Sequence, residues 1–261
     1  KVFLIDYFKQ NIQQTSWLPE IFSLEDFVKE LSELNILDNI DLVFKLYHTH
    51  QQIEGKQSET FEDFLSWANT LLQDFNEVDR YLVSAEELYS FLSEAKALES
   101  WNLGERELSE FQKNYLRFWR KLGEYYQHYG KQLIEEKSAY QGLAFRQLAE
   151  DLRANKIEVQ QEKQLYFAGF NALTLAEESI IHHFVKNHHA QLLWDADEYY
   201  LNDNNQEAGR FLRAHKKKQK TFEWTFSDLL ESEKEINIYS ISGDIAQAKL
   251  MGELVQQKNS K

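Results

Sequence analysis

Between residues 24 and 154, apolar side chains recur every three or four positions with little to interrupt them. One stretch follows Thr60, a residue suited to begin a helix, and has apolar positions at Phe61, Phe64, Leu65, Ala68, Leu71, Leu72 and Phe75. This spacing places apolar residues on one face of an α-helix. The chain contains a single proline, Pro19, so few residues would break such helices. The pattern predicts a block of about six helices over 24–154.

The pattern changes after Asn155. Three short apolar segments have the length and residue types of buried strands, at 164–170, 190–194 and 235–241. Helical patterns accompany them at 174–187, 207–215 and 245–256. Strands that alternate with helices are typical of βα units and a largely parallel sheet. We therefore expect an α/β fold with a large helical insertion, mostly α by residue count.

Both ends of the sequence have a helical pattern. Residues 1–12 are apolar at helical spacing without a preceding cap, and the chain stops just after the pattern at 245–256. We therefore expect a piece of a longer polypeptide, with the first strands of the sheet lying before Lys1. The predicted parts are an edge of the α/β core, a helical subdomain and an α/β core segment, at 1–23, 24–154 and 155–261.

Composition excludes several kinds of site within this segment. Cysteine is absent, which excludes disulfides, thiolate metal sites and cysteine nucleophiles. There is no GxxxxGK[ST] phosphate loop, no HExxH and no GxSxG. No apolar run approaches the roughly 20 residues that span a bilayer, and no signal-peptide pattern opens the chain, so a cytoplasmic location is the expectation. A net charge of −14 opposes nucleic-acid binding by the molecule as a whole.

One segment departs from this acidic balance. The run RFLRAHKKKQK contains no acid and six cations, Arg210, Arg213, Lys216, Lys217, Lys218 and Lys220. Contacts between such side chains and phosphates release counterions and give salt-dependent affinity, so we predict that this run contacts DNA. The alternative is a solvated helix end. A second set of cations, Lys113, Arg117, Arg120 and Lys121, is interleaved with aromatic residues that we expect to belong to the core, Tyr115, Phe118 and Trp119.

No catalytic residue and no metal site are predicted in this segment, and Asp195 and Asp197 are the only metal candidates. They lie two apart after the strand predicted at 190–194, where paired carboxylates can bind Mg²⁺. The commoner alternative is a polar loop that caps Tyr199 and the following turn. For the histidines at 182–189, a helix end with partly cationic side chains is favoured over metal ligation.

The strand at 164–170 raises a specific question. In many nucleotide-driven enzymes such a strand ends in an acid that handles magnesium, whereas this one ends in Ala168, Gly169, Phe170 and Asn171. We expect Tyr166, Phe167 and Phe170 to serve the core and Gly169 to permit a tight exit from the strand. Asn171 and Thr174 are expected to form the turn and cap the next helix.

The order of these segments resembles a known family. The segments are WLPEIFSLEDFVKEL, FEDFLSWANTLLQDFNEVDRYL, a long helix rich in Trp and Tyr, AYQGLAFRQLAEDL, YFAGFNALTLAEE, LLWDADEYYLND, AGRFLR and INIYSISGDIAQAKLMGELV. Their succession is similar to the N-terminal, helicase-like half of AddB- and RecC-type proteins. It resembles more closely the proteins of Bacteroidetes-type bacteria labelled PD-(D/E)XK nuclease family. The likeness covers nearly the whole chain and lies in the order of the segments.

The resemblance implies an incomplete P-loop, superfamily 1 helicase-like core, with 24–154 as its 1B-like subdomain and 155–261 as its 1A-like segment. It also implies a place in a bacterial helicase–nuclease that processes double-strand DNA ends for recombination. The expected partners are DNA, as double-strand ends or single strands, and an AddA- or RecB-like helicase–nuclease subunit. A PD-(D/E)XK exonuclease module would lie beyond Lys261, and Mg²⁺ would serve that parent protein, with no cofactor in this segment.

RecC-like subunits keep the helicase fold without the ATPase motifs, and the acid-free strand is similar in that respect. Our first hypothesis is therefore a non-hydrolysing scaffold or DNA-binding module of a double-strand-break repair helicase–nuclease. The second is an ATP-dependent DNA motor whose phosphate loop lies outside this segment. The third is an acidic helical module that binds other proteins.

Overall fold

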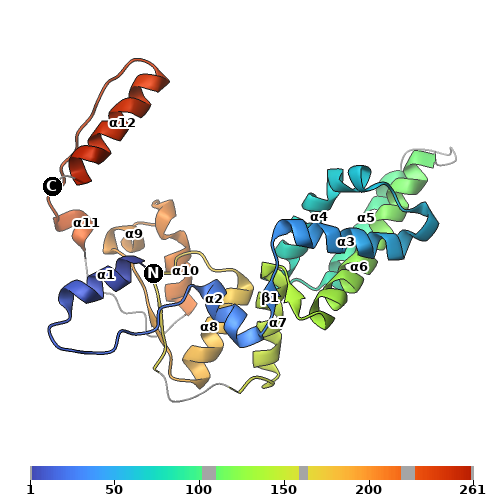
Figure 1. Cartoon of the computed structure of the whole chain (residues 1–261), viewed down its shortest axis with the longest axis horizontal. Helices are drawn as coiled ribbons and strands as arrows, with labels where there is room; N and C mark the ends of the chain where they lie inside the picture. The colour runs from blue at the N-terminus through green and yellow to red at the C-terminus, as the bar shows by residue number, and fades with distance from the viewer. Residues whose placement is uncertain (1, 102–109, 159–163, 219–226, 260–261) are drawn as a thin grey trace. The chain divides into compact units, whose positions relative to one another are not determined.

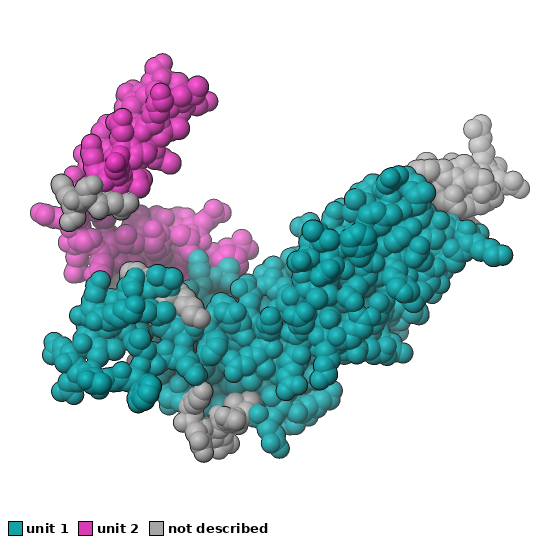
Figure 2. All heavy atoms as spheres, viewed as in Figure 1, with its two compact units in different colours: residues 1–195 teal, residues 196–261 magenta. Residues whose placement is uncertain are grey.

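The computed structural model describes residues 2–101, 110–158, 164–218 and 227–259. Most of these residues lie in helices. The chain divides into two compact units, Lys1–Asp195 and Ala196–Lys261, which are considered separately below (Figure 2). No helix within the described ranges is both long enough and apolar enough to cross a membrane.

The first unit contains a group of four helices, α3 (Asn39–Glu54), α4 (Phe61–Arg80), α5 (Ala85–Trp101) and α6 (Glu110–Glu135), with the short 3₁₀ helix η1 (Gly55–Gln57) after α3. Two short strands lie at its base, β1 (Asn35–Ile36) and β2 (Ser138–Ala139), and they pair in parallel. The chain thus enters and leaves the group of helices at neighbouring points (Figure 1). This connection was not predicted, because a strand of two residues has no detectable period.

The rest of the first unit combines helices with a second parallel pair of strands. Its elements are α1 (Val2–Asn11), α2 (Leu24–Ser32), α7 (Gln141–Arg153), β3 (Tyr166–Ala168), α8 (Leu175–Asn187) and β4 (Gln191–Leu193). Phe167 of β3 lies opposite Leu192 of β4, and the pairing is parallel. The strands predicted at 164–170 and 190–194 and the helix predicted at 174–187 are therefore confirmed, with the strands shorter than predicted.

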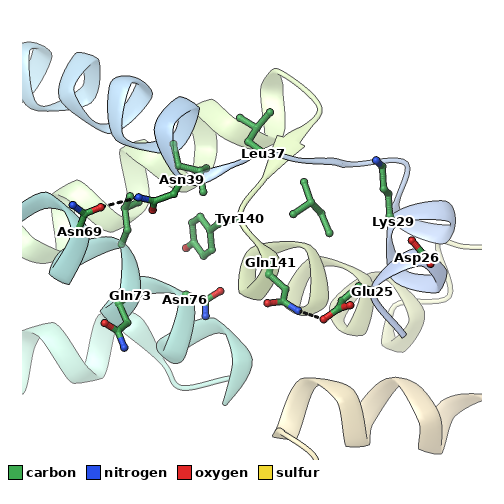
Figure 3. Close-up of a pocket in the computed structure, with 13 residues that line it drawn as sticks. Glu25, Asp26, Lys29, Leu37, Asn39, Asn69, Gln73, Asn76, Tyr140 and Gln141 are labelled. Atoms are coloured by element: carbon green, nitrogen blue, oxygen red, sulfur yellow. Dashed lines mark hydrogen bonds between the residues drawn. The ribbon is translucent and has the colours of Figure 1, made fainter. Parts of the chain in front are cut away.

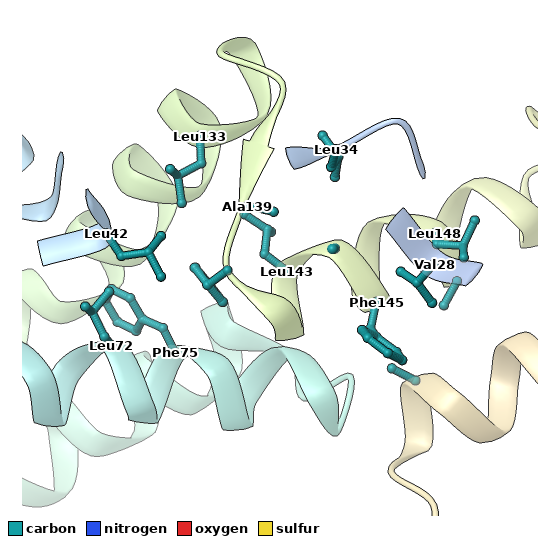
Figure 4. Close-up of a cluster of buried hydrophobic side chains, with 14 of the residues drawn as sticks. Val28, Leu34, Leu42, Leu72, Phe75, Leu133, Ala139, Leu143, Phe145 and Leu148 are labelled. Atoms are coloured by element: carbon teal, nitrogen blue, oxygen red, sulfur yellow. The ribbon is translucent and has the colours of Figure 1, made fainter. Parts of the chain in front are cut away.

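Helix α7 joins the two parts of this unit because it is apolar around much of its circumference. Gly142, Leu143, Ala144, Phe145, Leu148, Ala149 and Leu152 are all buried. A helix of this kind needs partners on more than one side, and α7 packs against both α4 and α8. One continuous core results, which runs from Leu42, Leu72 and Phe75 to Val28 and Phe145 (Figure 4).

Helix starts agree with the side chains that the sequence offers. The Ser23 Oγ accepts a hydrogen bond from the Asp26 N–H at 3.1 Å, and the Thr60 Oγ1 accepts one from the Asp63 N–H at 3.3 Å. Thr174 and Glu177 form a reciprocal capping box at the start of α8. These contacts satisfy N–H groups that have no partner inside the first turn of a helix.

The second unit contains α9 (Glu198–Asn202), η2 (Glu207–Gly209), α10 (Arg210–Lys218), α11 (Asp228–Glu231) and α12 (Asp244–Asn259). The helices predicted at 207–215 and 245–256 are present as η2 with α10 and as α12. The strand predicted at 235–241 is wrong, because this segment forms no strand. A strand requires a neighbour for its N–H and C=O groups, and none of the described residues pairs with it. Ile236 and Ile238 are accordingly 75% and 91% exposed.

The sheet is also smaller than the α/β prediction implied. Over the described ranges it consists of two separate parallel pairs, β1 with β2 and β3 with β4. The mostly helical content of the prediction is confirmed, and the parallel direction of the predicted strands is confirmed for β3 and β4.

Candidate functional site

The cationic run predicted to contact DNA lies on α10. Arg210 and Lys217 are exposed, and they are seven residues apart, which places them on the same side of the helix. Leu212 and His215 are buried and hold the opposite side of α10. Lys216 and Lys218 are also exposed, whereas Lys220 lies outside the described residues. The amphipathic character of α10 therefore presents part of the cationic run to solvent.

Arg213 has a different environment from the other cations of this run. Its Nη1 donates to the carbonyl oxygens of Tyr200 and Asp203, the latter at 2.9 Å, and its Nη2 donates to the carbonyl oxygen of Gln206 at 2.8 Å. The guanidinium thus holds the main chain between α9 and η2. The terminal nitrogens of Arg213 are thus already used inside the second unit, which leaves this side chain less available to phosphates than the exposed cations of the run.

The chain turns sharply after β3, as predicted, and no acid lies at this turn. Gly169 adopts a φ of +78°, which is a left-handed conformation that glycine accepts at little cost, and its N–H donates to the Leu193 carbonyl oxygen at 3.3 Å. Phe167 is buried and Phe170 packs against the core. Tyr166 was expected to serve the core, but it is 54% exposed, because neighbouring side chains on a strand point to opposite faces.

The two metal candidates have different surroundings. Asp195 is exposed. Asp197 is buried, and its carboxylate accepts hydrogen bonds from the N–H groups of Tyr199 and Leu229, each at 2.9 Å. The predicted alternative, a cap for Tyr199 and its turn, therefore describes Asp197. Among the described residues, no group of three or more His, Asp or Glu side chains could hold a metal ion.

The histidines at 182–189 lie at the end of α8 and beyond it. The rings of His183 and His188 have centroids 5.4 Å apart. Burial, and then the neighbouring His188, lowers the pKa of His183 below its ordinary value. Both influences favour the neutral ring of His183.

The second set of cations lies on α6 and contacts the end of α3 and η1. The Arg117 Nη1 donates to the Gln57 Oε1 at 2.7 Å, and the Lys121 Nζ lies 2.9 Å from the Glu54 Oε2. Phe118 and Trp119 pack against the core, as predicted. Arg120 is exposed, and the side chains of Lys113 and Tyr115 lie outside the described residues.

A buried polar network around His50 was not predicted. The His50 Nε2 accepts a hydrogen bond from the Glu59 N–H at 3.2 Å, so its Nδ1 carries the proton and donates to the Tyr125 Oη at 2.7 Å. The Tyr125 hydroxyl in turn donates to the Glu54 Oε1 at 3.1 Å. Burial lowers the pKa of His50 despite the opposing influence of Glu59 and Glu54. This network links α3 to α6 and favours a neutral imidazole.

We predict that His50 makes the protein less stable in mild acid. Its pKa is lowered on folding, so the unfolded chain binds a proton more readily than the folded chain as pH falls through about 6.5. Urea unfolding at about pH 7.5 and about pH 5.5 should show a loss of stability that is smaller in His50→Gln. His48→Gln, an exposed change on the same helix, should keep the full loss. Equal pH dependence in all three proteins would contradict the assignment.

A second buried network centres on Asp79, which is fully buried. Its carboxylate accepts hydrogen bonds from the hydroxyls of Tyr126 and Tyr140 and from the Arg146 Nε at 2.6 Å. The Arg146 Nη2 also donates to the carbonyl oxygens of Val78 and Val83. Burial raises the pKa of the Asp79 carboxyl although all three donors oppose this. The sequence does offer a sign of this network, because Asp79 lies four residues after Phe75 and therefore on the apolar face of α4.

The first unit also has a groove with a volume of about 770 Å³. It lies among α2, α4, the start of α3 and the start of α7 (Figure 3). Its lining combines side-chain amides with aliphatic and ionisable residues. None of the sequence motifs pointed to it, because its walls come from three separate stretches of the chain, at 25–42, 69–76 and 140–141.

The comparisons with known proteins identify no family. A scan against protein-family models finds no match, and a search of curated proteins finds no significant match.

Proposed function

We propose that this chain is a non-hydrolysing, helicase-like module that binds DNA within a bacterial double-strand-break repair helicase–nuclease. The observation that carries the proposal is the cationic side of α10. Arg210 and Lys217 are exposed on it, opposite the buried Leu212, in a chain whose net charge is −14. A local cationic surface on an acidic protein can bind phosphates although the net charge of the molecule opposes it.

Two features of the fold support the helicase-like part of the proposal. The helices α3 to α6 are inserted between β1 and β2, as a 1B-like subdomain would be. The strand β3, paired in parallel with β4, is followed by Gly169 and Phe170 and lacks the acid that ends such a strand in many nucleotide-driven enzymes. The first feature supports the fold, and the second supports the absence of hydrolysis.

The setting of the module is proposed from the resemblance. An AddA- or RecB-like subunit would supply the motor, and a PD-(D/E)XK exonuclease module in the parent protein would use Mg²⁺. In this arrangement the present chain positions DNA for chemistry that occurs elsewhere.

The proposal is tested by reversing charge on α10. Arg210→Glu with Lys217→Glu is expected to weaken binding to a duplex with a single-stranded overhang by about tenfold or more at low salt, because two phosphate contacts are lost. The slope of log affinity against log salt should fall by about two for the same reason. Fluorescence anisotropy over a salt series measures both quantities.

The matched control changes the same number of charges elsewhere. Lys131, which is 75% exposed, lies on α6, and Lys186 is exposed on α8. Lys131→Glu with Lys186→Glu should retain the affinity of the unchanged chain within a few-fold. Equal losses in the two double variants, or no DNA affinity of the unchanged chain at low salt, would refute a binding site on α10.

The second candidate function is a module that binds other proteins. It is favoured by exposed apolar side chains in and before α12, namely Ile236, Ile238, Tyr239, Ile245, Met251 and Val255. Clustered apolar exposure is typical of surfaces that another chain covers. This candidate replaces the first if the unchanged chain shows no salt-dependent affinity for DNA.

A further inference from the structure

The groove on the first unit is notable for its side-chain amides. Five of its lining residues carry one: Asn39, Asn69, Gln73, Asn76 and Gln141 (Figure 3). An amide side chain offers a hydrogen-bond donor and an acceptor at neighbouring atoms. A peptide main chain offers the same two groups at each residue. The groove and an extended peptide are therefore chemically complementary.

The spacing of two amides on α4 is close to that of an extended chain. Asn69, Gln73 and Asn76 lie at positions i, i+4 and i+7, which form one stripe along a helix. Asn69 and Gln73 are separated by about 6 Å along the helix axis, and Asn76 lies about 4.5 Å beyond Gln73. An extended peptide presents equivalent N–H and C=O groups on one edge about every 6.6 Å. The amides of Asn69 and Gln73 can thus meet two successive outward-facing pairs of main-chain groups.

The present hydrogen bonds leave donors and acceptors of the stripe available. The Asn76 Oδ1 accepts from the Gly142 N–H at 2.7 Å, which turns its NH₂ group away from that contact. The Asn69 Oδ1 accepts from the Asn39 Nδ2 at 2.9 Å. Gln73 is exposed, and its amide makes no hydrogen bond with any residue that the structure describes. Hydrogen bonds therefore hold the side-chain oxygens of Asn69 and Asn76 in place, while the amide of Gln73 stays available to a ligand.

The remaining lining residues disfavour other ligand classes. Glu25, Asp26 and Lys29 give the groove one more acidic than basic side chain, which opposes a phosphate backbone. Tyr140 is the aromatic member of the lining, but it is 4% exposed and its hydroxyl donates to Asp79. A nucleobase or a sugar would therefore find no open aromatic face for stacking.

We propose that this groove binds an extended segment of a partner protein through the main chain of that segment. The amides of Asn69 and Gln73 pair with its N–H and C=O groups, and the half-buried Ile36 and Leu37 of the lining contact its apolar side chains. A segment without excess negative charge fits the acidic wall formed by Glu25 and Asp26. The proposal goes beyond DNA binding, because it concerns different residues in the other compact unit, and either function can fail without the other.

The test begins with selection of short random peptides on the immobilised 261-residue chain. Affinities of selected peptides are then measured by calorimetry for the unchanged chain and for Asn69→Ala with Gln73→Ala. Both positions are exposed on a helix, where alanine is the best helix former, so the variant should fold. We expect at least about a tenfold loss of affinity, because two amide pairings are removed.

Two controls separate main-chain recognition from other binding. Gln52→Ala removes an exposed amide from α3 outside the groove and should leave affinity unchanged. Methylation of the peptide nitrogens that face α4 should abolish binding while it keeps every peptide side chain. Selected peptides that bind equally to the Asn69→Ala, Gln73→Ala variant, or that tolerate methylation at every position, would overturn the proposal. Competition by a single-stranded oligothymidylate at the groove would also overturn it in favour of nucleic acid.

Discussion

Replacing Arg146 with methionine is expected to lower the free energy of unfolding by about 3–5 kcal/mol, which is the cost of breaking a buried ion pair. Methionine retains much of the aliphatic stem but removes the donors that Asp79 accepts from at 2.6 Å. The Asp79 carboxylate is fully buried and would lose its only charged partner within the described contacts. The carbonyl oxygens of Val78 and Val83 would lose a donor as well. Urea unfolding followed by circular dichroism measures the change.

Helix α7 offers a matched control for this prediction. Arg153 lies on the same helix, is exposed, and its Nε donates to the Ser179 Oγ at 3.2 Å. Arg153→Met should change stability by no more than about 0.5 kcal/mol. A double-mutant cycle with Asp79→Asn should show strong coupling to Arg146→Met. Similar losses at Arg146 and Arg153 would contradict the role assigned to the buried network.

Replacing Gly142 with alanine is the second change with a large expected effect. A Cβ at this position would collide with the main-chain carbonyl oxygen of Asn76 and would lie 2.9 Å from its side-chain oxygen. The backbone of α4 cannot turn aside as a flexible side chain could, so α7 must move away from it. We expect a loss of about 1–3 kcal/mol or more, typical of an overpacked core, in thermal or urea unfolding.

At Gly130, in contrast, substitution by alanine is expected to raise the free energy of unfolding. It lies inside α6, and an added Cβ would meet nothing within 4 Å. Gly130→Ala should therefore stabilise the protein by about 0.5–1 kcal/mol, because alanine restricts the unfolded chain and favours the helix. If both glycine variants shifted stability in the same direction, the close approach of α7 to α4 would be in doubt.

Two contacts between α4 and α7 also shape the candidate peptide groove. Gly142 allows the start of α7 to reach Asn76, and Arg146 ties the same helix to the end of α4. Tyr140 and Gln141, which immediately precede Gly142, line the groove. Loss of either contact is therefore expected to disturb peptide binding together with stability, whereas Asn69→Ala and Gln73→Ala should affect binding alone.

Much of the local structure could be predicted from the sequence. The helix starts at Ser23, Thr60 and Thr174 follow from side chains that accept hydrogen bonds from nearby N–H groups. The strands β3 and β4 follow from short apolar runs bounded by turn residues. These signals are local, because the groups that interact lie within a few positions of one another. The segment at 235–241 has the same signal but no described neighbour to pair with, which is why the prediction failed there.

By itself, the sequence determined the mostly helical content, the parallel β3 and β4 pair, and a cationic run in an acidic chain. Only the tertiary structure decided which cations remain available, because Arg213 is used by carbonyl oxygens that a loop brings to it. It also decided the partners of Asp79 and His50 and the position of the amide groove. Helix periodicity arises from contacts within a turn. The contacts of His50 with Tyr125 and of Asp79 with Tyr140 and Arg146 join residues more than sixty positions apart, so packing sets their geometry.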